Sequence, residues 1–374
     1  MDLELPPDDD PRRVEIRKWL AEHPSPSGRE LAEAGYVAPH WPRPWGLEAD
    51  PIHQLIIEEE LKRAGVRKPT NPIGIGWAGP TILHAGTEEQ KQRYLFRILS
   101  GEDIWCQLFS EPGAGSDLAS LQTKAVADGD VFIVNGQKIW TSLAHIARYG
   151  ILLARTDPTA PKRDGITYFI CPMDAAGITI RPIVEMTGSH TFNEVFFDDV
   201  RIPAENVVGE VNKGWSLAKV TLANERVSLS EEGAIWGAGP TALDLIDLVR
   251  TSGGVRDACL RQRLSRLYTE HEILRLLRLR QITSAIKGSN PGPWSSIRKL
   301  LADEHGQHVM ELAKDLAGTG GTLATKGPLG TGAGIWHYGF LFSPALTIGG
   351  GTWAIQRNII GEKILGLPKD PAVN

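Results

Sequence analysis

The spacing of hydrophobic and polar positions divides the chain into three stretches. Up to about residue 100 the spacing is helical, since apolar side chains recur with that period after Asp10-Pro11 and again over residues 52–63. From Ile104 to Ile202 the pattern is that of short strands separated by Asp, Gly and Pro turns. The helical period returns after Trp215 and holds almost to the end. The pattern therefore predicts helices, then strands, then helices.

The middle stretch predicts an all-β region. Asp128-Gly129-Asp130 separates two strand-like segments and indicates a hairpin, because Gly and Asp tolerate the positive φ that such a turn requires. Roughly six short strands without helices between them are typical of an antiparallel barrel or sandwich. Further on, residues 217–229 predict one long helix and residues 260–279 another, so that the C-terminal half is expected to be a helical bundle.

Composition excludes several classes of function. The 374 residues carry 40 Lys and Arg against 45 Asp and Glu, a formal net charge of -5, which offers no basic surface for nucleic acid. No apolar run approaches the roughly 20 residues that span a bilayer. The 3 cysteines are widely spaced and the 10 histidines form no HExxH pattern, so that neither a disulfide framework nor a catalytic metal is expected. The acidic N-terminus is unlike a secretory signal, and a cytoplasmic location is expected.

Two strings in the strand region could carry chemistry. Residues 109–117 (FSEPGAGSD) leave a strand with glycines where a backbone approaches something closely, but no Lys-Ser/Thr follows as in a phosphate loop, and a simple turn explains them equally well. Residues 135–142 (NGQKIWTS) place Trp140 between polar residues at a strand end. Trp140 could stack on a planar cofactor while Ser142 donates to a ring heteroatom, or it could fill the core as an edge Trp.

A carboxylate interrupts an apolar stripe in the helix that follows Trp215. Leu222, Glu225 and Leu229 have i, i+3, i+7 spacing, which puts Glu225 on the apolar side. Burial there would raise the pKa of Glu225 towards the range of a general base. The alternatives are a structural carboxylate bonded to another helix and a helix rotated enough to expose it. Arg226 follows directly, but neighbours on a helix do not face each other.

Three glycines begin the last helical segment. Residues 347–358 read TIGGGTWAIQRN, and free amides at such a helix start suit an anion or a polarised carbonyl.

Together these strings resemble those of the acyl-CoA dehydrogenases, from about Glu48 to Pro368. The most specific segments are the SEPGAGSD and NGQK-x-WTS runs, FFDDVRIP at 196–203, and IGGGT-x-x-IQRNII near the end. The resemblance implies an α+β multidomain flavoenzyme with an N-terminal helical domain (1–103), a central antiparallel β-barrel (104–210) and a C-terminal four-helix-bundle domain (211–374). FAD is the implied cofactor and an acyl-CoA thioester the implied substrate.

The resemblance also implies roles for individual residues, which we carry over by position. Those matching the flavin-binding positions are Phe109, Ser110, Trp140, Ser142, Gly351 and Thr352. Those matching substrate-binding positions are Ser116, Arg226 and Gly350. The family places its base either at a Glu in the C-terminal glycine turn, where this chain has Gly350, or at a Glu before Arg on the first helix of the last domain, as in isovaleryl-CoA dehydrogenase. Here that pair is Glu225-Arg226, so the stripe argument and the resemblance coincide on Glu225.

The reaction implied is α,β-dehydrogenation to the 2-enoyl-CoA. Glu225 would remove the α proton while hydrogen bonds to the thioester carbonyl raise its acidity, the β hydride would pass to flavin N5, and an electron-transfer flavoprotein would reoxidise the flavin. One departure concerns the R-x-x-F-G segment that usually holds the adenosine half of FAD from a neighbouring subunit. Here residues 249–254 read VRTSGG. Another is Trp353-Ala354, which replaces the commoner small residue followed by Glu or Gln.

These departures leave the assembly open, and two rival functions also remain. The chain could form a heteromer whose partner supplies the missing segment, as in some actinobacterial steroid side-chain dehydrogenases, or a homomer in which Arg250, Arg256 or Arg261 replaces it. Dimers and tetramers are both expected forms. The rivals are a flavin oxidase or monooxygenase on the same fold and a non-catalytic subunit of a heteromeric dehydrogenase. The acyl pocket is expected near Trp77 and Trp236.

Overall fold

The computed structural model describes residues 6–230, 233–236, 238–286, 292–319 and 334–369. Contacts between residues divide the chain into two compact units. We call residues 2–185 and 189–224 the first unit, and residues 186–188 and 225–374 the second unit. The element order is helices, then strands, then helices, as the hydrophobic pattern predicts. The glycine-rich segment 318–334, which the sequence predicts to be a connection before the last helix, falls largely outside the described residues. Among the described helices, none is long and apolar enough to cross a membrane.

The N-terminal part of the first unit is helical. Its helices are α1 (Pro11–Glu22), α2 (Gly28–Glu33), α3 (Pro51–Arg63), a π-helix (Gly74–Ala78), α4 (Gly79–Ala85) and α5 (Glu88–Ser100). Asp10 caps α1 by accepting a hydrogen bond from the backbone amide of Arg12, as expected of an Asp before Pro11. Helix α5 ends at Gly101, whose φ of 76° is the left-handed conformation of a helix terminus.

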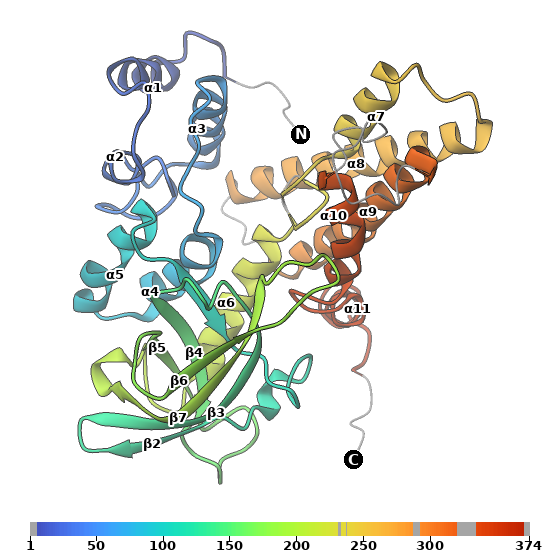
Figure 1. The fold of residues 1–374 in the computed structure, drawn as a ribbon. Coiled ribbons are helices and arrows are strands. Elements are labelled where there is room, and N and C mark those ends of the chain that lie inside the picture. The colour runs from blue at the N-terminus through green and yellow to red at the C-terminus, as the bar shows by residue number, and fades with distance from the viewer. Residues whose placement is uncertain (1–5, 231–232, 237, 287–291, 320–333, 370–374) are drawn as a thin grey trace. The chain divides into compact units, whose positions relative to one another are not determined.

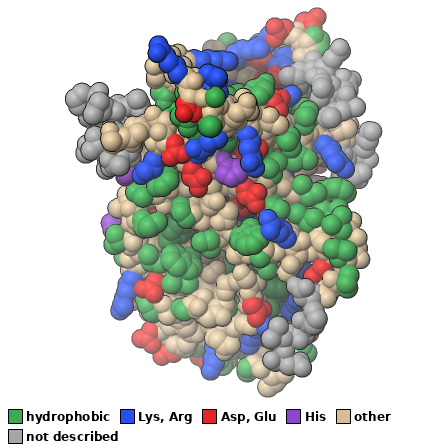
Figure 2. Space-filling model, turned by 90° about the vertical axis from the view of Figure 1, so that its right-hand side faces the viewer, with side chains coloured by type: hydrophobic (Ala, Val, Ile, Leu, Met, Phe, Trp, Pro, Cys, Tyr) green, Lys and Arg blue, Asp and Glu red, His purple; other side chains and the backbone are tan. Residues whose placement is uncertain are grey.

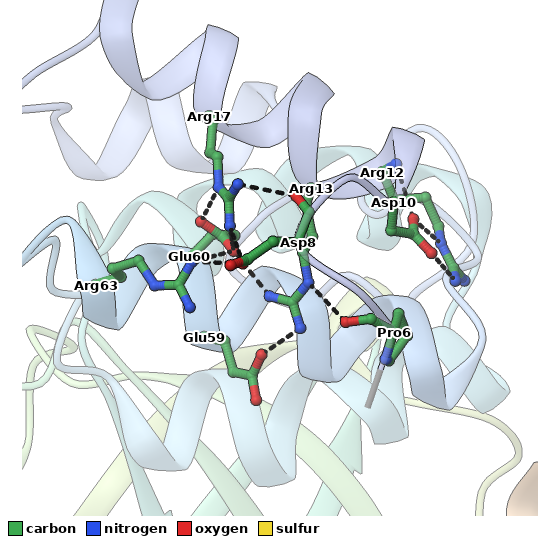
Figure 3. Close-up of polar contacts among 9 residues, drawn as sticks. All are labelled: Pro6, Asp8, Asp10, Arg12, Arg13, Arg17, Glu59, Glu60 and Arg63. Atoms are coloured by element: carbon green, nitrogen blue, oxygen red, sulfur yellow. Dashed lines mark hydrogen bonds and ion pairs between the residues drawn. The ribbon is translucent and has the colours of Figure 1, made fainter. Parts of the chain in front are cut away.

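A buried charge cluster joins α1 to α3 (Figure 3). The Glu60 side chain is only 2% exposed and accepts hydrogen bonds from Arg13 Nη1 and Arg17 Nε, each at 2.8 Å. Arg13 also donates to Glu59 at 2.6 Å. The hydrogen bond from Arg17 is the main reason why the pKa of Glu60 lies below its usual value. A carboxylate this buried is tolerated because two guanidinium groups neutralise it.

The strand region forms one mixed sheet in the first unit. Its strands are β1 (Trp105–Leu108), β2 (Lys124–Asp128), β3 (Val131–Ser142), β4 (Tyr149–Arg155), β5 (Ile166–Pro172), β6 (Ile178–Pro182) and β7 (Phe192–Pro203). The order is β1-β4-β2-β3-β7-β6, with β5 on β4. The hairpin predicted at Gly129 is confirmed, since it joins β2 to β3 with a φ of 64°. The long strands β3 and β7 pair along their length (Figure 1).

Pairing in this sheet differs from the antiparallel expectation. β4 runs parallel to β1 and, at one residue pair, to β2. The reason is that the segment after β3 makes no hairpin: it carries the chain to the edge beside β1, where the amide of Arg148 donates to the carbonyl of Ile104 at 2.8 Å. One face of the sheet buries an apolar core that includes Phe132, Val134, Leu152 and Phe169.

The remaining elements are helical. Helix α6 (Gly214–Ser228) begins in the first unit and ends in the second, and it is followed by α7 (Ala242–Thr251), α8 (Ala258–Ile286), α9 (Ser295–Ala317), α10 (Gly334–Phe342) and α11 (Trp353–Lys363). Helix α9 packs against α8, α10 and α11 and carries much of the buried surface of the second unit. Figure 2 shows acidic and basic side chains interspersed with hydrophobic ones on the face that it draws, which agrees with the near balance of charge in the sequence.

Candidate active site

In the first unit, a buried lysine ties the 109–111 segment to β3. Lys138 is fully buried, and its Nζ donates to the carbonyl of Phe109 at 3.0 Å and to Glu111 Oε1 at 2.8 Å. The amide of Ile139 donates to the carbonyl of Ser110 at 2.9 Å. Burial is the main reason why the pKa of Lys138 falls to about 8. Two strings that are separate in sequence therefore lie side by side, with Ser110 next to β3.

A β-bulge turns Trp140 out of the sheet. The pairing of β3 with β7 shifts register between Lys138 and Thr141, and Trp140 has a φ of 59°, which is rare for an aromatic residue. Its side chain is 58% exposed, and its edge contacts Phe192 at 6.2 Å between ring centroids. Within this unit the indole is therefore not an edge Trp filling the core. A strained, exposed aromatic at a strand end suits contact with a second molecule.

The other residues predicted in this unit have different environments. The Phe109 side chain is buried against Tyr168, so that only its main chain, whose carbonyl already accepts from Lys138, is left to meet a ligand. Ser142 is half-buried at the end of β3, and Ser116 lies exposed in the loop. A Cβ added at Gly113 or Gly115 would meet no atom within 4 Å. The close approach that those glycines suggest is therefore not to atoms of the described chain.

In the second unit, the Glu225 carboxylate lies against a glycine turn. The residue is 7% exposed, as its place on the apolar stripe predicts. A Cβ added at Gly350 would lie 3.6 Å from Glu225 Oε1 and only 2.5 Å from Leu229 Cδ1. Gly350 and Gly351 have φ values of 68° and 87°, a conformation that only glycine adopts without strain. The turn thus comes close to the carboxylate because it has no side chains.

Side chains of two helices hold the carbonyl groups of this turn. Lys299 Nζ, from α9, donates to the carbonyl of Gly349 at 3.0 Å. Gln356 Nε2, from α11, donates to the carbonyls of Gly350 at 3.1 Å and Gly351 at 3.0 Å. Thr352 caps α11 by accepting a hydrogen bond from the amide of Ile355 at 3.3 Å.

The amide groups of the turn are differently placed. Within the described ranges, no atom accepts a hydrogen bond from the amide of Gly350 or Gly351. Amides in such a turn can donate to the oxygen of a polarised carbonyl, as the glycine pattern in the sequence suggests.

Buried charges surround Glu225. Lys299 is fully buried and its Nζ lies 2.5 Å from Asp303 Oδ2. Burial lowers the pKa of Lys299 and raises the pKa of Asp303 to about 7, because both charged forms lose water. Burial also lowers the pKa of Arg226, whose Nε has no hydrogen-bond partner among the described residues. The carboxylate therefore lies in a dry environment with cations close by.

Trp236, which was predicted to lie near the acyl pocket, also contacts the glycine turn of the second unit. Trp236 has a φ of 47°, and a Cβ added at Gly349 would lie 2.4 Å from its Cζ2. Its ring packs edge-on against Phe342 with centroids 5.1 Å apart. Trp77, in the first unit, is buried in the π-helix, an irregularity that is frequent at functional sites.

Residues 249–254, which stand where the R-x-x-F-G segment is expected, lie at the end of α7. Gly253 and Gly254 both have positive φ, so that the chain turns there towards α8. Arg250 pairs with Asp247 on the surface at 3.2 Å, and Arg261 donates to the carbonyl of Arg256 at 3.0 Å. Among the described residues, no three His, Cys, Asp or Glu side chains gather as metal ligands would.

Family models cover nearly the whole chain. The N-terminal domain of acyl-CoA dehydrogenases matches residues 10–102, the middle domain residues 106–200 and the C-terminal domain residues 212–365. The chain belongs to the acyl-CoA dehydrogenase family. It therefore has the family's three-domain fold of helices, sheet and helices, in a family of flavoprotein oxidoreductases that act on acyl-CoA. The boundaries predicted at 103 and 210 stay predictions.

Mycobacterial acyl-CoA dehydrogenases are among the similar curated proteins. The chain is 45% identical to FadE34 of Mycobacterium tuberculosis over 91% of its length, but it spans only 46% of that protein. It is 37% identical to IpdE1 of the same organism over 96% of this chain and 97% of that one.

Two solved structures agree over nearly the full chain. The Tcur3481-Tcur3483 steroid ACAD has a TM-score of 0.83 at 31% identity, covering 99% of this chain and 100% of that one. The ChsE4-ChsE5 complex of Mycobacterium tuberculosis has a TM-score of 0.80 at 33% identity, with coverage of 99% and 100%.

Three buried side chains were missed in reading the sequence, although each left a signal. Lys138 stands at an inward position of β3, where alternation calls for an apolar residue. Lys299 likewise interrupts an inward stripe of α9. Gln356 belongs to the last motif string, but periodicity alone cannot say that its amide folds back onto the turn.

Proposed function

We propose that this protein is an FAD-dependent acyl-CoA dehydrogenase that oxidises a thioester to its 2-enoyl-CoA, with Glu225 as the base. The observation that supports this most is the Glu225 carboxylate, buried against a glycine turn whose amides at 350 and 351 have no acceptor among the described residues. A base beside carbonyl-polarising donors is the arrangement that removal of an α proton requires, because the donors stabilise the charge that develops on the thioester oxygen.

Each residue of the second unit has a distinct role in this proposal. Glu225 takes the α proton, the amides of Gly350 and Gly351 donate to the thioester carbonyl, and Arg226 binds a polar part of the substrate through its half-buried guanidinium. The low exposure of Glu225 excludes water that would otherwise stabilise the carboxylate and weaken the base.

The first unit supplies residues that fit the ring system of FAD. The exposed face of Trp140 would cover the isoalloxazine, Ser142 and the main chain at Phe109 and Ser110 would bond its polar edge, and Ser116 would meet the substrate between flavin and CoA. When bound, the flavin supplies the hydride acceptor. In the second unit, Gly351 and Thr352 belong to the same turn as Gly350 and are the residues proposed there for flavin contact.

The adenosine half of FAD fits less well. Residues 249–254 offer no Phe-Gly, and Arg250 is held on the surface by Asp247. We therefore propose a heteromer whose partner subunit binds the adenosine half of FAD. Two similar structures support this proposal, because the Tcur3481-Tcur3483 steroid ACAD and the ChsE4-ChsE5 complex each carry the names of two chains. Because the similar Tcur3481-Tcur3483 protein is a steroid ACAD, steroid-derived thioesters are the first to test. An electron-transfer flavoprotein as acceptor, a cytoplasmic location, a barrel in the middle domain and a C-terminal four-helix bundle remain part of the proposal.

Glu225→Gln tests the base. The flavin-loaded protein, purified with any partner it needs, should keep its absorption spectrum but lose turnover by at least about a thousandfold, since the amide cannot accept the proton. The control is Glu311→Gln, which changes an exposed carboxylate on α9 in the same way. Turnover of the Glu225 variant close to that of the control would refute the assignment. If FAD occupancy is complete without a partner, the heteromer proposal is refuted, but the assignment of Glu225 is not affected.

A further inference from the structure

The carbonyl groups of the glycine turn are all taken by buried side chains. Lys299 holds the carbonyl of Gly349 and, at 3.2 Å, that of Leu346. Gln356 holds those of Gly350 and Gly351. Lys299 and Gln356 are both 0% exposed, so that neither contact competes with water. Two helices, α9 and α11, thus grip three successive peptide groups of the turn.

Gripping the carbonyls also sets the direction of the amides. In a trans peptide the C=O of one residue and the N–H of the next point in opposite directions. Fixing the carbonyl of Gly349 therefore directs the amide of Gly350, and fixing that of Gly350 directs the amide of Gly351. These are the two amides for which the described chain provides no acceptor.

A lysine is a costly way to hold a turn for stability alone. Burying an ammonium group carries a large desolvation cost before pairing, and apolar residues of the same volume often serve stability equally well. Here Asp303 lies 2.5 Å from the Lys299 Nζ, and Asp303 and, to a smaller extent, the Glu225 carboxylate oppose the lowering of the pKa of Lys299 by burial. A cation at this place strengthens the dipole of the peptide that it holds, since a hydrogen bond from a charged donor polarises its acceptor.

We propose that Lys299 and Gln356 are positioning residues that orient the amides of Gly350 and Gly351 as donors to the acyl carbonyl. The inference deepens the proposed function and rests on it, because it assigns to the turn the task of polarising the thioester beside Glu225. Neither side chain touches the substrate. Each acts through the peptide group that it holds, and Lys299 in addition places a positive charge behind the amide of Gly350.

The test compares two ligands that differ by one oxygen. One is a 2-enoyl-CoA thioester, which is the product and is not consumed, and the other is the matching 2-enyl thioether, which lacks the carbonyl. Their dissociation constants are measured on the flavin-loaded protein by the change in flavin absorbance, and kcat is measured with the saturated thioester. The variants are Lys299→Met and Gln356→Met, which keep the side-chain length and lose the donors. The controls are Lys363→Met on α11 and Gln262→Met on α8, both exposed.

We expect each variant to bind the thioester about tenfold more weakly and the thioether within about twofold of wild type, because one carbonyl hydrogen bond is misaligned. The value of kcat should fall by about a hundredfold, since such donors count most in the transition state. The inference is overturned if both ligands lose affinity equally, or if the ratio of the two dissociation constants is unchanged in both variants. It is also overturned if the wild-type protein does not bind the thioester more tightly than the thioether. If Lys299→Met does not fold, Gln356→Met decides alone. Failure of the proposed function has another sign, namely a Glu225→Gln enzyme that turns over normally.

Discussion

Replacing Gly350 by Ala isolates the steric requirement of the glycine turn. The new methyl group would lie 2.5 Å from Leu229 Cδ1 and 3.0 Å from Lys299 Cε, well inside van der Waals contact. The residue would also have to keep a φ of 68°, where an L side chain is strained. Leu229 is a flexible side chain and can move aside at some cost, whereas Lys299 is fixed by its buried contacts.

The magnitude follows from these two penalties. The left-handed conformation costs a residue with a Cβ roughly 1–2 kcal/mol, and forcing a methyl group into a packed site costs roughly 1–3 kcal/mol. We expect Gly350→Ala to lower the free energy of unfolding by about 3 kcal/mol. Adding Leu229→Ala removes the 2.5 Å contact but leaves Lys299 Cε at 3.0 Å, so that Gly350→Ala made in that background should cost less, namely the conformational penalty and the remaining contact with Lys299.

The assay is urea unfolding followed by circular dichroism, with kcat/KM measured on the same preparations. Gly361→Ala, in α11, is the control, because its Cβ would meet only Leu367 Cδ1 at 3.7 Å, an ordinary contact. An alanine in a helix is expected to leave stability unchanged or raise it by up to about 1 kcal/mol. If Gly350→Ala unfolds within about 0.5 kcal/mol of wild type, the reasoning about the turn is refuted.

Two further predictions concern carboxylates. Moving the base with Glu225→Gly and Gly350→Glu together should leave kcat at least about a hundredfold below wild type, because a Glu at 350 meets the same contacts as the alanine; recovered turnover would contradict this. Glu60→Gln should lower the free energy of unfolding by about 3 kcal/mol. Glu59→Gln, at the partly exposed neighbour, should lower it by less than about 1 kcal/mol. Since the hydrogen bond from Arg17 lowers the folded-state pKa of Glu60, this difference should be present above pH 4.5 and lost as pH falls through the folded-state pKa. A difference that grows on acidification would refute it.

Local pattern was sufficient for the elements and for the base candidate. Hydrophobic period separated helices from strands, Asp10-Pro11 marked the start of α1, and Asp128-Gly129-Asp130 marked the β2–β3 hairpin. Each of these signals depends on a few neighbouring residues, and neighbouring residues fix local geometry. The burial of Glu225 could be predicted for the same reason, because the residues three before and four after it are apolar and share its helix face.

What a pattern could not give is the pairing of distant segments. The parallel pairing of β4 with β1 depends on where the chain goes after β3, which strand periodicity does not record. Trp140 was open to two readings because a single register shift between β3 and β7 decides whether its ring is buried or exposed. A register shift of one residue moves a side chain to the opposite face of the sheet, so that a local sequence signal cannot decide whether the Trp140 ring is buried or exposed.

The chain by itself therefore determined its family, the order of its elements and the identity of the buried carboxylate. Only the tertiary structure brought Lys299 from α9 and Gln356 from α11 onto the carbonyls of residues 349–351, and brought Glu225 from α6 against Gly350. The physical reason is that a motif records which residues are present, whereas the direction of a peptide group is set by the side chains that hold its carbonyl. Those side chains come from helices that are far apart in sequence, and they meet only when the helices pack.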